Sequence, residues 1–430
     1  MFIERDELVK DSFRLIKPVV DMRGVYSPNY KRNITMVLPT LMRTLGLDLE
    51  EANTLLSDRY LKSYLEEVLS SRVENIVFLV IDSLGFQQFT KYSKLLSNKA
   101  FYFPISSVFP TITSTAIMSL HTGKYPEQHG VLGYKIFIEE LGTIIDTLKF
   151  STEKAQYRDS LTRIGLNFSN FIWEESLHKK IDSERILDVS LYNYSIANTG
   201  LSTVLHPNIV SFGDMIDGFS LVNKLLCKSD GKRKLIHIYM DSVDELSHKY
   251  GPESFQIELN INLMEKALKA LSSGIPPGEA EKTVLVLASD HGQSRVDPQS
   301  QLNLQDMDSE QGLRYFRSAV GKSGRTLHFY VKRDKIEEAY NFISERIGEN
   351  GLVFRFDDLR RRLGLKAGRA GKVKNRLGDI ICVLTAEKTA QLRSSEAEAK
   401  IIDTPLLGQH GGLSYEELCS ICAFINLKEL

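Results

Sequence analysis

Three predominantly apolar runs stand out along the chain, and each of them ends on an aspartate. They read NIVFLVID at 75–82, LIHIYMD at 235–241 and VLVLASD at 284–290. Such short, mainly apolar runs are typical of strands that are buried on both faces of a parallel sheet. Segments with helical spacing, such as 255–274, separate the runs. The pattern therefore predicts an α/β fold with a mostly parallel central sheet flanked by helices.

The segments outside these runs predict two additions to that sheet. Residues 1–70 have leucines at helical spacing and Asn33 as a candidate N-cap, so we expect an N-terminal helical segment. This segment would cover the core or form an oligomer contact. Residues 321–403 read as strand, helix and strand, which predicts a small inserted α+β module. The core would then comprise 71–320 and 404–430.

Composition narrows the class of protein. Apolar residues make up 42% of the chain and charged residues 25%, as in a soluble globular protein. The formal net charge of -1 argues against affinity of the whole surface for nucleic acid or acidic lipid. The first residues, MFIERDELVKDSF, lack the apolar stretch of a secretory signal, so we expect a cytoplasmic protein with no membrane segment. Cys419 and Cys422 are expected in a buried strand rather than in a redox or metal site.

Aspartates and histidines recur beside the predicted strand ends and glycine turns. Asp244 and His248 are four residues apart, so on a helix they project from one face and suit a transition metal. Each such feature is weak by itself, because exposed helix pairs and structural histidines are common. Together they approach the number of groups that two divalent ions in one site require. The set comprises Asp82, Asp244, His248, Asp290, His291 and His410.

A stretch rich in hydroxyl groups, FPTITSTAIMSLHTG at 109–123, precedes a predicted helix. Serine and threonine are good helix caps, so these hydroxyls are candidates for caps, for packing or for a nucleophile. The stretch alone leaves the choice open. His121 and His129 lie in the same block, and we expect them to shape a turn rather than to bind metal.

Five blocks of the sequence resemble the alkaline phosphatase superfamily, and within it the type I phosphodiesterase and nucleotide pyrophosphatase branch. They follow the family's order from about 75 to 415 and read FLVIDSLG, FPTITSTAIMSLHTGKYPEQHGVLGY, YMDSVDELSHKYGP, SDHGQ and GQHGGLS. The resemblance implies an alkaline-phosphatase-like core and two divalent ions. Zinc is the usual metal of this branch, and manganese or iron would also suit these ligand types.

Residue by residue, the resemblance also implies roles. The family's nucleophile is the second threonine of a Pro-Thr-x-Thr motif, which is Thr113 here. It would attack phosphorus and form a phosphothreonine that water then hydrolyses. One ion would be held by Asp82, Asp290 and His291 with the oxygen of Thr113, and the other by Asp244, His248 and His410.

One departure from the family concerns the substrate. Nucleotide pyrophosphatases have an asparagine after the HG of the second block, whereas this chain reads HGVLGYKIF. Tyr134 or Lys135 is therefore the candidate donor to the phosphate. A phosphomonoester would need a further cation, which the basic stretch 360–376 could supply. We favour a solvated loop for that stretch, because charge runs usually face water.

The resemblance implies a metal-dependent phosphoric ester hydrolase of the phosphodiesterase or nucleotide pyrophosphatase type. Its substrate would be a small phosphoester such as a nucleotide. Phosphomonoester hydrolysis, phosphonate hydrolysis and phosphoglycerate-mutase-like transfer use the same metal core and are the alternatives. A non-catalytic, metal-stabilised binding protein is the remaining one.

Overall fold

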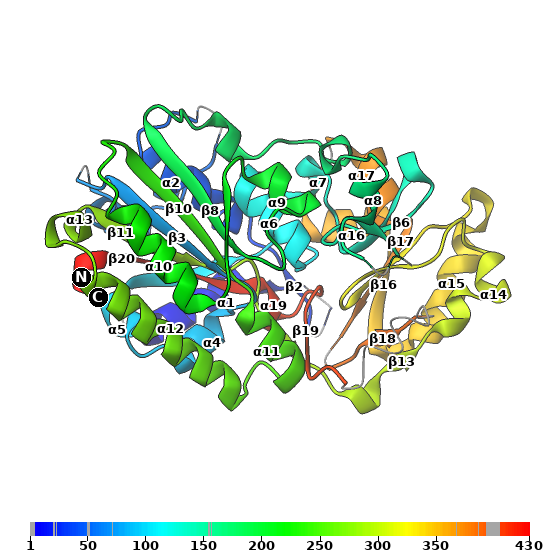
Figure 1. Cartoon of the computed structure of the whole chain (residues 1–430). Helices are drawn as coiled ribbons and strands as arrows, with labels where there is room; N and C mark the ends of the chain where they lie inside the picture. The colour runs from blue at the N-terminus through cyan, green and yellow to red at the C-terminus, as the bar shows by residue number, and fades with distance from the viewer. Residues whose placement is uncertain are drawn as a thin grey trace.

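A seven-stranded mixed sheet forms the centre of the molecule (Figure 1). The computed structural model describes residues 5–19, 22, 24–49, 52–70, 72–153, 155, 157–366, 368–385, 387–392 and 405–430. The three predicted apolar runs form three adjacent central strands, which pair in parallel and are buried along nearly their whole length. The parallel majority that the sequence predicts is therefore confirmed, with β20 antiparallel to both of its neighbours. The strand order is β4 (Phe101–Ser106), β20 (Cys419–Asn426), β11 (Thr283–Ala288), β3 (Asn75–Ile81), β10 (Arg233–Met240), β8 (Ile186–Asn193) and β9 (Ile209–Phe212).

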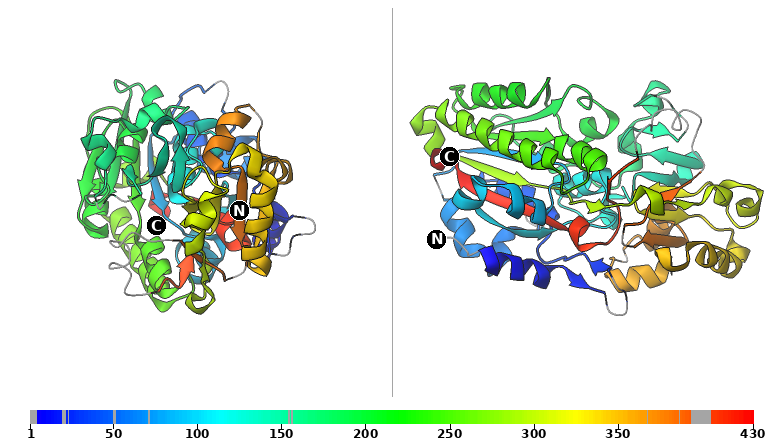
Figure 2. Two further views of the ribbon diagram at one scale, coloured as in Figure 1. Left: turned by 90° about the vertical axis from the view of Figure 1, so that its right-hand side faces the viewer. Right: turned by 90° about the horizontal axis from the view of Figure 1, so that it is seen from below.

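Helices lie on both faces of this sheet (Figure 2). Strand β10 shows the two faces, because its successive side chains point in opposite directions. Ile238 packs close to Gly218 of α10, whereas the ring of His237 lies 4.7 Å from the ring of His121 in α6. Helix α12 packs on α10, and α2 packs on α6. These helices are α2 (Val37–Thr44), α6 (Thr113–Thr122), α10 (Met215–Leu226) and α12 (Phe255–Ser273).

Shorter helices complete the two parts of the fold. None of the helices in the described ranges is long and apolar enough to cross a membrane. The shorter helices are α3 (Lys62–Val68), α4 (Phe86–Tyr92), α5 (Leu96–Lys99), α7 (Pro126–His129), α8 (Ser160–Arg163), α9 (Gly200–Leu205), α13 (Pro277–Glu281), α14 (Glu310–Leu313) and α19 (Tyr415–Leu418).

The N-terminal segment covers the core. Helix α1 (Arg5–Leu15) packs against β4, and the ring of Phe13 stacks on Tyr415 with centroids 4.8 Å apart. Asn33 is the predicted cap: its side chain accepts a hydrogen bond from a backbone N–H at 3.1 Å, at the start of a short 3-10 helix before α2. The small hairpin of β1 (Lys17–Pro18) and β2 (Tyr26–Ser27) was not predicted, because two-residue strands leave no periodicity to detect.

A second seven-stranded sheet draws on two separate parts of the chain. Four of its strands come from the segment 321–384, with α15 (Ile336–Ile347) packed beside them. The other three come from 135–152, so the predicted inserted module shares its sheet with residues assigned to the core. Residues 393–403 of that module lie outside the described residues, and its boundaries stay a prediction. The strand order is β16 (Gly351–Arg355), β17 (Ile380–Leu384), β15 (Thr326–Phe329), β14 (Gly321–Ser323), β5 (Lys135–Ile138), β6 (Thr143–Asp146) and β7 (Ser151–Thr152).

Two short strand pairs connect these parts. They are β12 (Ser294–Arg295) with β19 (Gly408–Gln409), and β13 (Leu302–Asn303) with β18 (Ala390–Gln391). Cys419 and Cys422 lie in β20 and are buried, as the sequence predicts.

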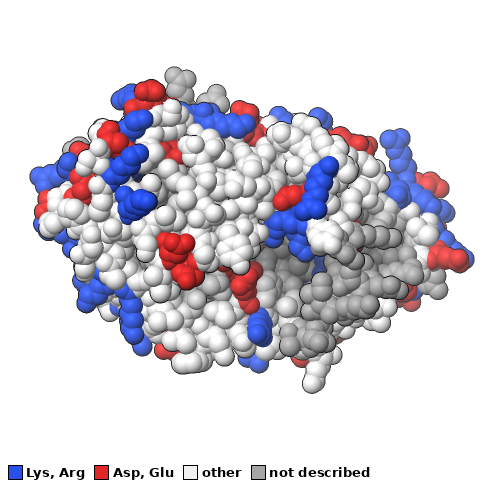
Figure 3. Space-filling model, viewed as in Figure 1, with Lys and Arg blue, Asp and Glu red and all other residues white. Residues whose placement is uncertain are grey.

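The basic stretch 360–376 falls in α16 (Phe356–Leu363) and α17 (Ala370–Leu377), where acids of the same region pair with it. Arg361 and Arg362 both contact Asp358, at 3.4 and 3.2 Å. The buried Arg376 guanidinium donates to a backbone carbonyl at 2.8 Å. Figure 3 likewise shows basic and acidic side chains interspersed over one face of the molecule. Several positive charges of this stretch are therefore engaged with acids or backbone carbonyls of the protein itself.

Candidate metal centre

The carboxyl ends of three adjacent strands bring the predicted ligands to one place. Asp82 directly follows β3, and Asp290 lies two residues beyond the end of β11. Helix α11 (Ser242–Tyr250) begins two residues after β10 ends and carries Asp244 and His248. The carboxyl ends of parallel neighbours meet at one edge of a sheet, which is where ligands of α/β sheets bind.

The first ligand group consists of Asp82, Asp290 and His291, all of them buried. The Nε2 atom of His291 lies 3.6 Å from Oδ1 of Asp82 and 3.3 Å from Oδ2 of Asp290. The Tyr239 hydroxyl donates to the other oxygen of Asp82. Two backbone N–H groups donate to the other oxygen of Asp290, at 3.0 and 2.9 Å. Each carboxylate is thus held by one oxygen, and the second oxygen has no hydrogen-bond partner in the described part of the chain.

The second ligand group consists of Asp244, His248 and His410. The Nε2 atom of His248 lies 3.4 Å from one carboxylate oxygen of Asp244, and that of His410 lies 3.4 Å from the other. The side-chain amide of Gln293 donates to Asp244 at 3.0 Å. One carboxylate and two imidazoles in this arrangement form a ligand set that suits a transition metal.

All three histidines of the two groups are oriented in the same way. In each, Nδ1 donates to a backbone carbonyl, which leaves the lone pair of Nε2 directed at the carboxylates. This is the orientation that metal-binding histidines usually show. The contacts join His248 to Gly408 at 2.8 Å, His291 to Gly292 at 3.0 Å and His410 to Thr111 at 2.9 Å.

Thr113 lies beside both groups. It is the first residue of α6, and its hydroxyl lies 3.2 Å from Nε2 of His291. The rings of His291 and His410 stack with centroids 4.1 Å apart, so the first and second ligand groups adjoin. The N-terminus of a helix presents free N–H groups and a positive dipole end, which together favour an anion.

The electrostatics of the site fit bound cations. Burial raises the pKa values of Asp82 and Asp290 above their ordinary values, and the neighbouring carboxylates raise them further. Burial also lowers the pKa of His291 to about 4 and that of His410 to about 3, so both rings are neutral and able to bind metal at pH 7. Facing carboxylates, unpartnered buried oxygens and neutral imidazoles together form a donor set that two divalent ions would satisfy.

Two glycines hold the loop that carries His410. Gly324, at the turn between β14 and β15, has φ +58°, and a Cβ on it would lie 1.9 Å from the carbonyl oxygen of His410. Gly411 has φ +98°, and a Cβ on it would lie 2.0 Å from the carbonyl oxygen of Ser323. Only glycine combines this backbone conformation with so close an approach. The second sheet therefore positions one member of the second ligand group.

The other hydroxyls near Thr113 pack rather than cap, since α6 has no side-chain cap. Thr111 donates to the carbonyl of Gly412 at 2.9 Å, and Ser114 accepts from Thr147 at 2.7 Å. His129 accepts a backbone N–H at 3.2 Å two residues further on, so it shapes the turn as predicted.

The two predicted substrate donors lie close to this region. The hydroxyl of Ser114 donates to the carbonyl of Gly133 at 3.4 Å, which places the following residue, Tyr134, near the start of α6. Lys135 is the first residue of β5. Both side chains are partly exposed. A role for either in substrate binding stays a prediction.

Sequence reasoning missed two residues that contact the ligands, Tyr239 and Gln293. Both lie inside segments that the sequence analysis had singled out. Gln293 closes the block SDHGQ, and Tyr239 lies two residues before the end of a predicted strand run, on a face that turns out to point at Asp82. No local pattern distinguishes such residues from ordinary strand and loop positions.

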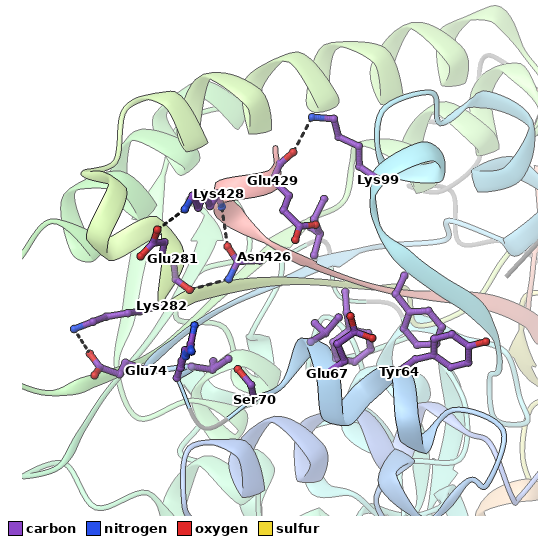
Figure 4. Close-up of a pocket in the computed structure, with 16 residues that line it drawn as sticks. Tyr64, Glu67, Ser70, Glu74, Lys99, Glu281, Lys282, Asn426, Lys428 and Glu429 are labelled. Atoms are coloured by element: carbon purple, nitrogen blue, oxygen red, sulfur yellow. Dashed lines mark hydrogen bonds and ion pairs between the residues drawn. The ribbon is translucent and has the colours of Figure 1, made fainter. Parts of the chain in front are cut away.

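A surface hollow lies at the opposite edge of the sheet, where β3 and β11 begin (Figure 4). Its charged residues neutralise one another: Lys282 pairs with Glu74 at 3.0 Å, and Lys428 pairs with Glu281. Paired charges at the amino ends of the strands offer no field for a phosphate. We therefore assign no function to this hollow.

The mixed α/β sheet and the two ligand groups at its carboxyl edge place the chain in the alkaline phosphatase superfamily. Within it, the sequence profile of the type I phosphodiesterase / nucleotide pyrophosphatase family matches residues 76–412, so the chain belongs to that family. The resemblance seen in the five sequence blocks is thereby confirmed.

Individual relatives are more distant. Venom phosphodiesterase 2 of Crotalus adamanteus is 26% identical over 203 residues, which are 44% of this chain and 22% of the venom protein. The venom phosphodiesterase of Macrovipera lebetinus is 24% identical over 202 residues, again 44% of this chain and 21% of that protein. The matches thus span about a fifth of the length of these curated relatives.

Solved structures show the same fold. Murine ectonucleotide pyrophosphatase / phosphodiesterase 5 superposes with a TM-score of 0.62 at 16% identity, over 81% of this chain and 87% of that chain. The human protein gives a TM-score of 0.62 at 15% identity, with the same coverage. An inactive threonine-to-alanine variant of the murine protein, in complex with AMP, has a TM-score of 0.61 at 15% identity and the same coverage.

Proposed function

We propose that this chain hydrolyses phosphodiesters or nucleotide pyrophosphates, with Thr113 as the nucleophile and two divalent ions, zinc by preference, in the two ligand groups. One observation carries the proposal: the Thr113 hydroxyl lies 3.2 Å from His291, at a helix N-terminus and beside both ligand groups. A threonine that only packed or capped would not need this position.

The residues of the chain divide the work. The hydroxyl oxygen of Thr113 attacks phosphorus, the bond from phosphorus to the leaving oxygen breaks, and a phosphothreonine remains. Water then attacks that phosphothreonine and releases the product. The first N–H groups of α6 face the anionic phosphate and orient it for both steps. The ions, when bound, lower the pKa of the attacking hydroxyl and neutralise charge on the attacking and leaving oxygens.

Which residues would hold the ions follows from the donor atoms. Asp82 and Asp290 each present one carboxylate oxygen that has no hydrogen-bond partner among the described residues, and His291 presents Nε2, which faces the Thr113 hydroxyl. Asp244, His248 and His410 present the second set, and zinc suits such nitrogen and oxygen ligands. The relatives support the same chemistry, because the inactive murine variant has an alanine in place of a threonine.

A diester is the favoured substrate, because the charges of the basic stretch 360–376 are already engaged within the protein. A monoester dianion needs an additional cation, and Arg361, Arg362 and Arg376 are engaged with acids or carbonyls of their own region. Tyr134 and Lys135 are the candidate donors to the remaining phosphate oxygen. A nucleotide is the substrate class that the AMP complex of the murine protein suggests.

The proposal is tested by comparing hydrolysis of a nitrophenyl phosphodiester and a nitrophenyl phosphomonoester with zinc or manganese added. We expect a diester preference that Thr113→Ala and metal chelation both abolish. Activity that survives chelation, with no transition metal detected by elemental analysis, would exclude the mechanism. A monoester preference would exclude the substrate class while leaving the nucleophile in place.

A further inference from the structure

Four histidines gather on the face of the central sheet that α6 covers, away from the two ligand groups. This histidine cluster draws on four separate segments, and its members are 0–2% exposed. Neighbouring rings lie close together, with centroids 4.5 to 5.2 Å apart. The members are His121 in the last turn of α6, His178 in a short 3-10 helix, His206 just after α9 and His237 in β10.

The hydrogen bonds on one side of the cluster orient His121. The Asp188 carboxylate accepts from Nδ1 of His178 at 2.8 Å. When His178 is neutral, its Nε2 accepts from Nδ1 of His121 at 3.1 Å. The proton of His121 is then on Nδ1, so its Nε2 has a lone pair. That atom is buried and has no hydrogen-bond partner within the described ranges.

Among the described residues, the ring of His237 has fewer hydrogen-bond partners than that of His121. Both of its ring nitrogens are buried without a hydrogen-bond partner among the described residues. Native proteins rarely leave buried polar atoms unpaired, and each such atom in a native structure calls for an explanation, such as a bound ion or water. A ring with two unpartnered nitrogens, in the middle of a buried strand, is therefore the sign of a ligand.

His206 closes the arrangement. Its Nδ1 lies 2.6 Å from the Ser190 hydroxyl and its Nε2 lies 2.8 Å from the Tyr192 hydroxyl. Hydroxyl groups rotate, so either nitrogen is able to bind an ion while the other keeps its hydroxyl partner. One nitrogen each from His121, His206 and His237 lie within 4.8 Å of one another.

We propose that His121, His206 and His237 bind a third divalent transition-metal ion, zinc by its preference for imidazole, in a buried site away from the substrate. Three imidazoles are sufficient for a zinc site, with water in the fourth position. Asp188 acts through His178 and fixes the ring of His121, as carboxylates commonly do behind a metal-bound histidine. Burial, with the neighbouring histidines, also lowers the pKa values of His121 and His206, which keeps these rings in the neutral form that binds metal.

The proposed ion would fasten α6 to the sheet. His237 belongs to β10, and His121 lies eight residues after Thr113, which is about 12 Å along the helix. The ion would thus hold the far end of the helix whose first residue is the proposed nucleophile. This assignment does not depend on the proposed function, because it concerns different ligands and a site closed to substrate.

The test separates this site from the two ligand groups. A parent variant carrying Asp82→Asn and Asp244→Asn is loaded with zinc, dialysed and analysed for metal by mass spectrometry. We expect one zinc ion per chain to remain, and addition of His237→Gln to remove it. His129→Gln, which changes a buried histidine outside the cluster, is the matched control and should keep the ion.

Two further readouts protect the test against misfolding. Zinc should raise the Tm of the parent variant, and that increase should disappear with His237→Gln while circular dichroism stays unchanged. X-ray absorption at the zinc edge should show imidazole ligands in the parent variant, without any mutation in the cluster. A parent variant that retains no zinc, or whose Tm does not respond to zinc, would overturn the proposal.

Discussion

The hydroxyl of Thr113 lies 3.2 Å from the Nε2 atom of His291, although 178 positions separate the two residues in the sequence. Thr113 begins α6, and His291 stands three residues after β11 ends. With Nδ1 of His291 donating to a backbone carbonyl, Nε2 accepts from the threonine hydroxyl. The same ring thus contacts both the proposed nucleophile and the first ligand group.

Replacement of Thr113 should remove activity without unfolding the protein. We expect Thr113→Ala to lower kcat for a phosphodiester by about 10³-fold or more, because the attacking oxygen is lost. Thr113→Ser keeps that oxygen and should retain measurable turnover. Ser114→Ala is the control, since Ser114 packs against Thr147 and should cost far less. Equal activity in Thr113→Ala and wild type, measured by steady-state kinetics, would refute the assignment.

Removal of a ligand from the second group should reduce the metal content. Asp244 lies 3.4 Å from both His248 and His410, so Asp244→Ala takes away the carboxylate that joins them. We expect the variant to hold one ion fewer per chain than the wild type, and to lose activity. Elemental analysis after dialysis gives the count. An unchanged count would show that these residues do not form a metal site.

Tyr239 should increase the metal affinity of the first ligand group by orienting the carboxylate of Asp82. Its hydroxyl donates to Asp82 and leaves the other carboxylate oxygen free. In Tyr239→Phe that oxygen is no longer oriented, so we expect metal affinity to fall by about 10- to 100-fold. Competition titration with a chromogenic chelator measures the change. Affinity equal to that of the wild type would show that the hydroxyl bond is incidental.

The buried pair of Glu417 and Arg325 should contribute to stability. Their charged atoms lie 3.2 Å apart with side chains 0–2% exposed, and Glu417 also accepts the backbone N–H of Gly412 at 3.0 Å. Glu417→Ala leaves a buried guanidinium without its acid, so the free energy of unfolding should fall by about 3–5 kcal/mol. Urea titration measures it. The exposed pair of Lys62 and Glu66 is the control, and Glu66→Ala should cost less than about 1 kcal/mol.

His328 should make stability depend on pH. Burial lowers its pKa from 6.5 to about 4, so between these values the unfolded chain binds a proton that the folded protein does not. The contribution of His328 to stability should therefore be constant above pH 6.5 and fall as the pH drops toward 4, by up to about 1.4 kcal/mol per pH unit. His328→Gln should reduce this slope in urea titrations with chelator present. Identical slopes in the variant and the wild type would contradict a neutral buried ring.

The elements with a strong local signal could be predicted from the sequence. The apolar runs became β3, β10 and β11, and the spacing of Asp244 and His248 fell on a helix. Gly411, beside His410, lies at a close backbone approach, since a Cβ on it would be 2.0 Å from the carbonyl oxygen of Ser323. In each case the information lies within a few consecutive residues, where burial and backbone conformation leave a pattern.

Features that depend on contacts between residues far apart in the sequence could not be predicted from local patterns. Strand β5 joins β14 through the pairing of Lys135 with Lys322. Neither short strand has a sequence pattern that indicates a pairing partner almost two hundred residues away. The histidine cluster is similar, because each member is a single residue in a different segment. His121 was predicted to shape a turn, yet its ring contacts His178 and His237 instead.

Because Gly324 packs against the carbonyl of His410, metal binding at His410 is thermodynamically coupled to the packing of the second sheet against the His410 loop. The backbone N–H of Arg325 donates to the carbonyl of His410 at 2.9 Å, so the loop that supplies a ligand also rests on β14 and β15. Whatever free energy an ion gains from a correctly placed His410 must, by reciprocity, stabilise the seated sheet by the same amount. The second sheet thereby contributes to the affinity for the ion, although it contributes no ligand of its own.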